Sequence, residues 1–288
     1  MTTARGVLTL LRPPNVFTAV SNSLAGMLIV GRVEPALLGA SAALYLAGLV
    51  LNDLFDREVD ARERPGRPIP SRQVSVRAAA RLGAALLAGG VALGALVGPA
   101  SFAVAGGVAA TVLAYDGGVK RTALGPFAMG LCRAGNFLLG LSVMGWAGVG
   151  KLGADGAHGP VLLGLYVVTL TFLARDEVPG NAAKRARAGV MTLALVGVGA
   201  AAWLATRAAA WPAWLAFALL AALVARNFGP LLHDASAPRT GRAIGGGILL
   251  IPMLDASVVA AAGHPLAALG VAALALPAVV LRRWFSPT

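Results

Sequence analysis

The most regular feature of the sequence is a series of long apolar runs separated by short polar segments. Most of the runs approach the ~20 residues that cross a bilayer as a helix. They cover approximately residues 14–31, 35–52, 78–97, 99–115, 123–147, 160–175, 188–206, 210–228, 243–262 and 265–281. The last two can also pack as one span and a partial one. The pattern predicts an all-α polytopic membrane protein, a bundle of about nine to ten transmembrane helices in a single domain over residues 1–288.

The composition supports a membrane protein and excludes an ordinary soluble domain. Hydrophobic residues make up 58% of the chain and charged residues 12%, and the mean hydropathy is +0.77. A soluble domain is only roughly 45–50% apolar. The alternating pattern of an outer-membrane barrel strand is absent from the sequence.

The net charge of +12 is distributed in a way that predicts orientation rather than a nucleic-acid partner. If the N-terminus is cytoplasmic, the external loops hold only Arg32, Lys151 and Arg207, and Arg133 lies inside a span. Other basic residues then face the cytoplasm, as the positive-inside rule requires. We therefore expect no nucleic acid. The Ala-, Gly- and Arg-rich sequence without targeting signals is typical of a bacterial inner-membrane protein with its N-terminus in the cytoplasm.

An acidic cluster follows the second apolar run, where residues 51–60 read LNDLFDREVD. Asn52, Asp56 and Asp60 are four residues apart, so on a helix they drift by only ~40° per step and share a face. Carboxylate and amide oxygens are ligands that suit Mg²⁺, which usually shares its coordination shell with water and phosphate. The spacing indicates a metal site at the cytoplasmic end of this span.

A simpler interpretation of the same residues is a solvated helix end. In that case Asp53–Arg57 and Asp60–Arg64 would form pairs between residues i and i+4. The following loop is rich in arginine, however, and includes Arg67. Guanidinium groups bind phosphoryl oxygens with two parallel hydrogen bonds, so acids followed by arginines favour a diphosphate site.

The same residues carry a resemblance to a known family. NDLFDREVD and the later RPGRPIPS are similar to the first Asp-rich motif, N-D-x-x-D-x-x-x-D, and the R-P-[LI]-P-S loop of the UbiA superfamily of intramembrane prenyltransferases. Further agreement lies in Arg-Pro-Pro at 12–14, in Tyr115 with Lys120 and Arg121, and in the AGVMTL segment at 188–193.

The resemblance implies a helical bundle around an apolar cavity that opens towards lipid. Two Asp-rich motifs at the cytoplasmic rim would bind an isoprenyl diphosphate through Mg²⁺. Ionisation would release diphosphate and leave an allylic cation for a lipophilic, often aromatic, acceptor to capture. The implied function is Mg²⁺-dependent prenyl transfer, with an isoprenyl diphosphate donor, a hydrophobic acceptor and membrane lipids as partners.

The resemblance also assigns roles to individual residues. The metal ligands would be Asn52, Asp56 and Asp60 for the first ion, and Asp176 and Glu177 for the second. The four acids of this set would be the catalytic residues. The substrate-binding residues would be Asn52, Asp53, Arg67, Tyr115, Lys120, Arg121 and Asn181. Asn22 joins them on its position alone, since a polar residue in the first span can face the diphosphate from the opposite wall. For Asn22, an interhelical hydrogen bond is an equal alternative.

The second motif departs from the family pattern. The family has a motif like D-x-x-D-x-x-G-D after the sixth span, whereas this chain has ARDEVPGN, in which Asp176 and Glu177 are adjacent and Asn181 replaces an acid. The form R-x-E-V-x-G resembles that of a branch called the EboC-like proteins. The lost charge leaves open a non-catalytic binder, carrier or flippase of isoprenoid diphosphates.

Two charged residues inside spans support a further alternative. Arg133 lies in the fifth apolar run and Asp255 in the ninth. Charged side chains at membrane depth are costly and usually face a partner or a cavity. The two can form a structural ion pair or help to bind a polar acceptor. They also leave open a secondary transporter with a site near the bilayer midplane.

Overall fold

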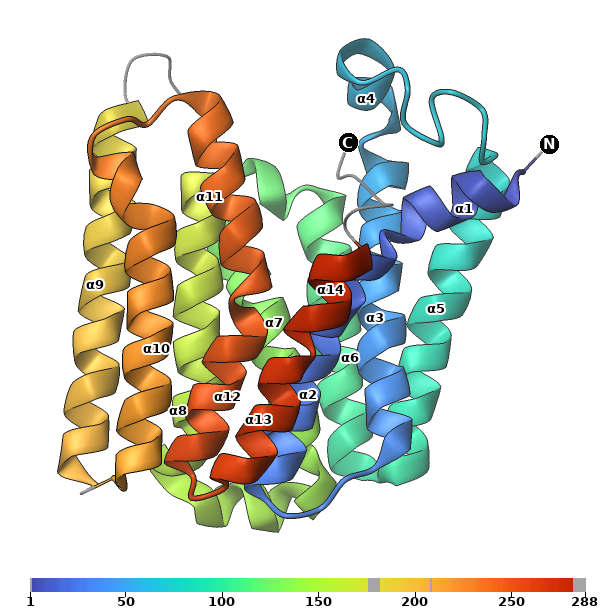
Figure 1. Cartoon of the computed structure of the whole chain (residues 1–288). Helices are drawn as coiled ribbons and strands as arrows, with labels where there is room; N and C mark the ends of the chain where they lie inside the picture. The colour runs from blue at the N-terminus through green and yellow to red at the C-terminus, as the bar shows by residue number, and fades with distance from the viewer. Residues whose placement is uncertain (1, 176–181, 208, 282–288) are drawn as a thin grey trace.

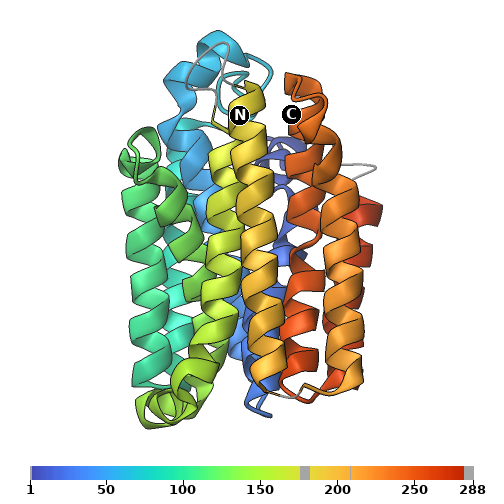
Figure 2. The ribbon, with the colours of Figure 1, turned by 90° about the vertical axis from the view of Figure 1, so that its left-hand side faces the viewer.

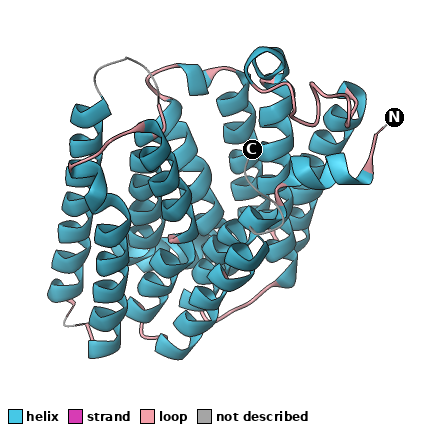
Figure 3. Ribbon diagram, turned by 45° about the horizontal axis from the view of Figure 1, so that its top comes forward, coloured by secondary structure: helices cyan, strands magenta, loops and turns pink. Residues whose placement is uncertain are grey.

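The computed structural model describes residues 2–175, 182–207 and 209–281, and within these ranges the chain is built from helices and loops (Figures 1 and 3). The α-helices are α1 (Ala4–Leu11), α2 (Val16–Ile29), α3 (Pro35–Phe55), α4 (Arg57–Glu63), α5 (Val76–Val97), α6 (Pro99–Gly117), α7 (Gly125–Leu141), α8 (Gly145–Leu173), α9 (Ala182–Thr206), α10 (Trp211–Phe228), α11 (Ala237–Leu249), α12 (Ile251–Ala261), α13 (Pro265–Ala273) and α14 (Ala275–Leu281). The short 3₁₀ turns are η1 (Pro13–Asn15), η2 (Val119–Arg121), η3 (Ser142–Met144) and η4 (Gly229–Leu232).

Most of the long helices stand side by side as an upright bundle (Figures 1 and 2). In the described part of the chain, eight helices are long and apolar enough to cross a membrane. They are Pro35–Phe55, Val76–Val97, Pro99–Gly117, Gly125–Gly153, Asp155–Leu173, Ala182–Thr206, Trp211–Leu232 and Ala237–Ala261. Four of these spans do not coincide with single helices: Gly125–Gly153 joins α7 to the first part of α8, and Asp155–Leu173 is the rest of α8. Likewise, Trp211–Leu232 joins α10 to η4, and Ala237–Ala261 joins α11 to α12. The predicted polytopic helical bundle is therefore confirmed.

The first and last predicted spans differ from the others in length. The run at 14–31 forms α2, a helix of 14 residues that buries polar side chains as well as apolar ones. The run at 265–281 is a shorter apolar segment that divides into α13 and α14. Both ends of the chain thus contribute shorter helices beside the eight longer spans.

Helices α2 and α7 pack closely enough for their backbones to meet at two glycines. A Cβ atom on Gly26 would lie 2.5 Å from the carbonyl oxygen of Phe137, and one on Gly140 would collide with the carbonyl oxygen of Ser23. Small residues permit such close approach in membrane bundles. The contact fixes the partly polar α2 against α7, below the acid-rich end of α3.

The last long span is broken between α11 and α12. The break falls at Leu250, and Pro252 follows it in the first turn of α12. Proline has no N–H to donate within a helix, so it favours the first turn of a new helix over the interior of a continuous one. Helix α10 packs more extensively against α12 than against α11. The two halves of the span therefore have different surroundings.

Candidate active site

Helix α3 ends and α4 begins at one end of the bundle (Figure 1). Charged residues from several elements form ion pairs there. Helix α3 ends at Phe55, Asp56 lies in the turn, and α4 starts at Arg57. The loop before α5, the end of α1 and the η2 turn after α6 contribute the basic partners. Segments far apart in the sequence thus meet at this rim.

The first group of ionic residues surrounds Arg67. Its Nη1 donates to Oδ1 of Asp53 at 3.1 Å and to Oδ2 of Asp60 at 2.8 Å. Arg12 adds a second guanidinium, whose Nη2 donates to Oδ1 of Asp53 at 2.6 Å. Both carboxylates are buried, with 2% and 3% of their surface exposed. Such buried charges need partners of this kind, because an unpaired one would be costly.

The second group lies around Lys120. Its Nζ is 2.8 Å from Oδ2 of Asp56 and 3.5 Å from Oδ1 of Asp116. Asn52 Nδ2 donates to the same Asp116 oxygen at 2.9 Å. The guanidinium of Arg121 is more exposed and lies 3.7 Å from Oδ1 of Asp56. The predicted residues of α3 and of the loop after α6 are therefore brought together.

Asp116 is a site residue that the sequence analysis did not assign. It ends α6 and is buried, with 4% of its surface exposed. A usable signal was present in the sequence, because Asp116 follows the matched Tyr115 and precedes Lys120 by four residues, a spacing that places two side chains on one helix face.

The predicted acidic stripe is divided between the two groups. Asp56 pairs with Lys120, whereas Asp60 pairs with Arg67, so the side chains of Asn52, Asp56 and Asp60 do not form one cluster. The helix is interrupted between them, which redirects Asp60 towards the loop before α5.

The alternative of local ion pairs is correct in one case and wrong in the other. Asp60 lies 3.9 Å from Arg64, as that interpretation predicts. Arg57, however, donates to the carbonyl oxygen of Leu54 and to Glu58 rather than to Asp53. The buried partner of Asp53 comes from distant sequence because α1 and the α4–α5 loop fold over the end of α3.

A cavity of about 290 Å³ lies beside the second group. Asn52, Asp116 and Tyr115 belong to its lining, so the cavity begins at the ionic rim. Its walls are largely apolar, and its far end is formed by Arg133, which stacks over the ring of Tyr45 at 4.7 Å from the ring centre. The remaining lining residues are Arg12, Leu44, Gly48, Leu49, Val108, Val112, Met129, Cys132 and Asn136.

Asn22 lies in a buried polar network in the bundle. Its Nδ2 donates to Oδ2 of Asp255 at 2.7 Å, and its Oδ1 accepts from Nη1 of Arg133 at 3.2 Å. Ser21 also donates to Asp255, at 2.6 Å. Arg133 and Asp255, for which an ion pair was one alternative, are therefore joined through Asn22. The interhelical hydrogen bond considered for Asn22 is present.

Two buried polar atoms of the rim have no hydrogen-bond partner. They are Oδ2 of Asp53 and Nε of Arg67. One is an acceptor suited to a cation and the other a donor suited to a phosphoryl oxygen. Both are buried within the ionic rim and lie outside the lining of the neighbouring cavity described above.

The donor set at the rim fits Mg²⁺. The Lys120 ammonium already lies between oxygens of Asp56 and Asp116, so these oxygens surround a positive charge. The described residues contain no group of three or more acidic, histidine or cysteine ligands. Two carboxylates with an amide leave room for the water and phosphate oxygens that Mg²⁺ prefers. The other predicted ligands, Asp176, Glu177 and Asn181, lie outside the described residues.

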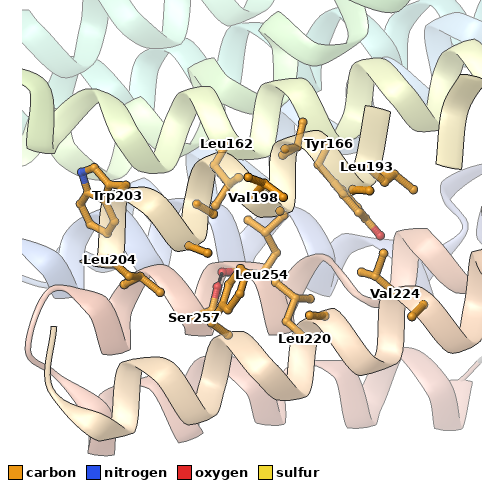
Figure 4. Close-up of a pocket in the computed structure, with 18 of the residues that line it drawn as sticks. Leu162, Tyr166, Leu193, Val198, Trp203, Leu204, Leu220, Val224, Leu254 and Ser257 are labelled. Atoms are coloured by element: carbon orange, nitrogen blue, oxygen red, sulfur yellow. Dashed lines mark hydrogen bonds between the residues drawn. The ribbon is translucent and has the colours of Figure 1, made fainter. Parts of the chain in front are cut away.

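A second, larger cavity of about 520 Å³ lies between α8, α9, α10 and α12 (Figure 4). Leu162, Leu193, Leu220 and Leu254 are among its predominantly apolar lining residues. Tyr166 also faces it, and the hydroxyl of this residue donates to the carbonyl oxygen of Gly247 at 2.9 Å. Its lining suits hydrocarbon chains and not a diphosphate.

Comparison with known proteins gives a family and a fold. The profile described as the UbiA prenyltransferase family matches residues 19–238. Digeranylgeranylglyceryl phosphate synthase of Ignicoccus hospitalis is 36% identical over 199 residues, which are 67% of this chain and 64% of the relative. The enzyme of the same name from Methanothrix thermoacetophila is 40% identical over 105 residues, 34% of this chain and 39% of the relative. The matched region thus spans less than two thirds of either relative.

Two solved structures share the fold. A UbiA homologue from Aeropyrum pernix superposes with a TM-score of 0.70 at 16% identity, covering 85% of this chain and 96% of that one. A UbiA homologue from Archaeoglobus fulgidus, determined with DMAPP and Mg²⁺ bound, gives a TM-score of 0.54 at 15% identity, covering 93% and 99%.

Proposed function

Because the chain belongs to the UbiA prenyltransferase family, we propose that it transfers an isoprenyl group from an isoprenyl diphosphate to a lipophilic acceptor within the membrane. One observation carries the proposal: the ionic group of Asn52, Asp56, Asp116 and Lys120 adjoins a cavity with apolar walls. A charged rim suits the diphosphate and a dry cavity suits the prenyl group, so both halves of the donor find matching chemistry.

The basic residues of the rim bind the diphosphate. Lys120 and Arg121 lie together beside Asp56, and the guanidinium of Arg67 is fixed by Asp53 and Asp60. The diphosphate leaving group gains negative charge as the C–O bond breaks. Fixed positive charge at this position therefore stabilises the transition state more than the bound donor, which lowers the barrier. Asp60 acts as a positioning residue, because it holds Arg67.

The acidic residues hold the metal. Asn52, Asp56 and Asp116 would provide oxygen ligands for one Mg²⁺, and we retain Asp176 and Glu177, with Asn181, as proposed ligands of a second. When bound, Mg²⁺ supplies Lewis-acid neutralisation of the departing diphosphate. Lys120, which pairs with both carboxylates in this structure, would then be available to bind phosphoryl oxygens.

The cavity protects the reacting carbon from water. Its walls come from α3, α6 and α7, which exclude water around the prenyl group. Tyr115 lines the cavity next to Asp116, where its electron-rich ring can face a developing cation. This supports a substrate-binding role for Tyr115.

The rim is proposed to face the cytoplasm of a bacterial cell. The basic residues concentrate on this side of the predicted spans, as the positive-inside rule expects of a cytoplasmic face. The relatives named above are archaeal, and their printed activity concerns a glyceryl phosphate lipid. A phosphate-bearing isoprenyl lipid therefore belongs among the acceptors to be assayed.

The transporter alternative receives little support from the geometry. Arg133 and Asp255 are held through Asn22 and by hydrogen bonds to α2, so they are committed to joining helices. The binder or carrier alternative rests on the altered second motif and differs from the enzyme in one outcome, namely binding without diphosphate release.

The experiment measures diphosphate release from purified protein in nanodiscs. Geranyl, farnesyl and geranylgeranyl diphosphates are supplied with and without Mg²⁺, together with aromatic and phosphate-bearing lipid acceptors. We expect Mg²⁺-dependent release that Asp56→Asn abolishes and Glu58→Gln preserves, because Glu58 is 79% exposed and contacts Arg57. Donor binding without release under every condition would support a carrier and overturn the enzyme.

A further inference from the structure

A separate hollow lies between α10 and α11. The beginning of α11 lies at the same end of the bundle as α4 (Figure 1), so the hollow is on the side of the ionic rim but on different helices. Its volume is about 430 Å³. The hollow forms beside the break at Leu250, where α11 packs less closely on α10 than α12 does. Both walls belong to candidate membrane spans, Trp211–Leu232 and Ala237–Ala261. The hollow therefore lies at the edge of the membrane.

A close helix crossing forms one side of this hollow. Asn227 Nδ2 donates to the carbonyl oxygen of Ala243 at 2.7 Å, which joins α10 to α11. The Asn227 amide also packs against Gly246, where a Cβ atom would collide with it. These contacts fix the spacing of the two helices, so the hollow is a property of the packed bundle.

The lining of the hollow is divided between charged and apolar residues. Arg226 lies near the end of α10, and Arg239 and Arg242 lie near the beginning of α11, so all three are towards the rim side. Leu223 lies about one turn further into the membrane than Arg226, and Leu250 about two turns further than Arg242. The hollow is thus basic at its outer end and apolar at its inner end.

The positive charge in this hollow is poorly compensated by the described residues. Arg239 pairs with Asp234 at 3.3 Å, and the Ser236 N–H that donates to this carboxylate lowers the pKa of Asp234. Arg226 and Arg242 form no ion pair with any described residue. Arg242 has a longer-range attraction to Asp234, which also lowers the pKa of that carboxyl. Three guanidinium groups therefore converge on the hollow, and Asp234 is the acid that pairs with one of them and attracts another.

We propose that this hollow binds the phosphate group of an anionic membrane lipid. Guanidinium forks match phosphate geometry, and basic pockets between transmembrane helices are suited to lipid head groups. The apolar inner end gives the first part of the lipid chains a surface over Leu223 and Leu250. A soluble phosphate would gain nothing from that surface, so the charge and the apolar contact together specify a lipid. The inference does not depend on the proposed prenyl transfer.

The test compares lipid retention by the whole protein in mild detergent, measured by native mass spectrometry. The probes are phosphatidylglycerol and phosphatidylcholine with identical chains. We expect preferential retention of phosphatidylglycerol. The double variant Arg226→Gln/Arg242→Gln should bind it about thirtyfold more weakly, since each basic residue near a lipid surface contributes about 1 kcal/mol and 1.4 kcal/mol is about tenfold.

The matched control removes the same charge elsewhere. Arg77 and Arg81 are exposed basic residues at the beginning of α5, on the same side of the bundle. Arg77→Gln/Arg81→Gln should retain phosphatidylglycerol within about twofold of the parent. Equal loss in both double variants would show general charge attraction and overturn a defined site.

A second variant tests the apolar end. Leu223→Gln keeps every arginine but should weaken retention of phosphatidylglycerol, with no effect on any binding of soluble glycerol phosphate. Equal retention of the two lipids overturns the proposal, and so does complete displacement of phosphatidylglycerol by millimolar glycerol phosphate. Unchanged retention in the Arg226→Gln/Arg242→Gln variant also overturns it.

Discussion

Removal of Arg67 should destabilise the fold through the two buried carboxylates that it serves. In Arg67→Met, Asp53 keeps Arg12 at 2.6 Å. Asp60 keeps only Arg64 among its described ion-pair partners, at 3.9 Å, and that side chain is 56% exposed. Breaking a buried pair by removing one partner typically costs 3–5 kcal/mol. We expect about 3 kcal/mol, since Arg64 can turn towards Asp60.

A double-mutant cycle isolates the electrostatic part of this loss. Arg67→Met/Asp60→Asn removes the stranded charge, so it should recover about 2 kcal/mol relative to Arg67→Met alone. The control Arg64→Met should cost at most about 1 kcal/mol, because its pair is long and solvated. The free energy of unfolding would be obtained from denaturant titrations in detergent, followed by circular dichroism.

Two outcomes would refute this reasoning. If Arg67→Met is no less stable than Arg64→Met, then Arg67 does not compensate buried charge. If Asp60→Asn lowers the free energy of unfolding of Arg67→Met by as much as it lowers that of the parent, the two residues are uncoupled. Either result would remove the basis for treating Asp60 as the residue that positions Arg67.

Two further predictions concern the second ionic group and the α2–α7 contact. Lys120→Met should bind Mg²⁺ more tightly in the absence of donor, because no ammonium competes for Asp56 and Asp116, yet it should release diphosphate at least about tenfold more slowly. Calorimetric titration measures the Mg²⁺ affinity and the release assay measures the rate. An unchanged affinity and an unchanged rate would contradict the prediction. Gly140→Ala should cost about 1–3 kcal/mol through backbone overlap with α2, whereas Gly106→Ala, which meets no atom within 4 Å, should not destabilise the protein in the same titration.

The membrane fold was largely predictable because hydropathy records it directly. Eight of the predicted runs correspond to the eight long apolar spans of the described residues. The connection between 123–147 and 160–175 was not predictable as helix, yet α8 begins at Gly145 and continues through a kink at Gly153. Glycine at a positive φ makes such a kink possible without a polar, loop-like sequence.

The membership of the rim was predictable, but its pairing was not. The motif identified Asn52, Asp56 and Lys120, and these do meet in the structure. Asp116 was missed because it is a single acid at the end of a different helix, 64 residues from Asn52. A four-residue spacing predicts a shared helix face only where the helix continues, and here it is interrupted at Asp56.

Asn22 shows a different limit of sequence reasoning. A polar residue in an apolar run indicates a partner or a cavity without distinguishing between them. The partner, Asp255, is 233 residues away and is brought near by the packing of α12 on α2. Long-range packing of this kind has no local signature in a single sequence.

The proposed enzyme depends on the carboxylate pair of Asp56 and Asp116 for Mg²⁺-dependent release of diphosphate. The most direct measurement compares the rate of diphosphate release by Asp116→Asn and Glu58→Gln with that of the parent, at saturating donor and over a range of Mg²⁺ concentrations. We predict that Asp116→Asn lowers the rate at least about a hundredfold and requires more Mg²⁺, as loss of a group that stabilises the transition state does. Glu58→Gln should behave as the parent. Full activity of Asp116→Asn with an unchanged Mg²⁺ dependence would contradict this dependence on the carboxylate pair.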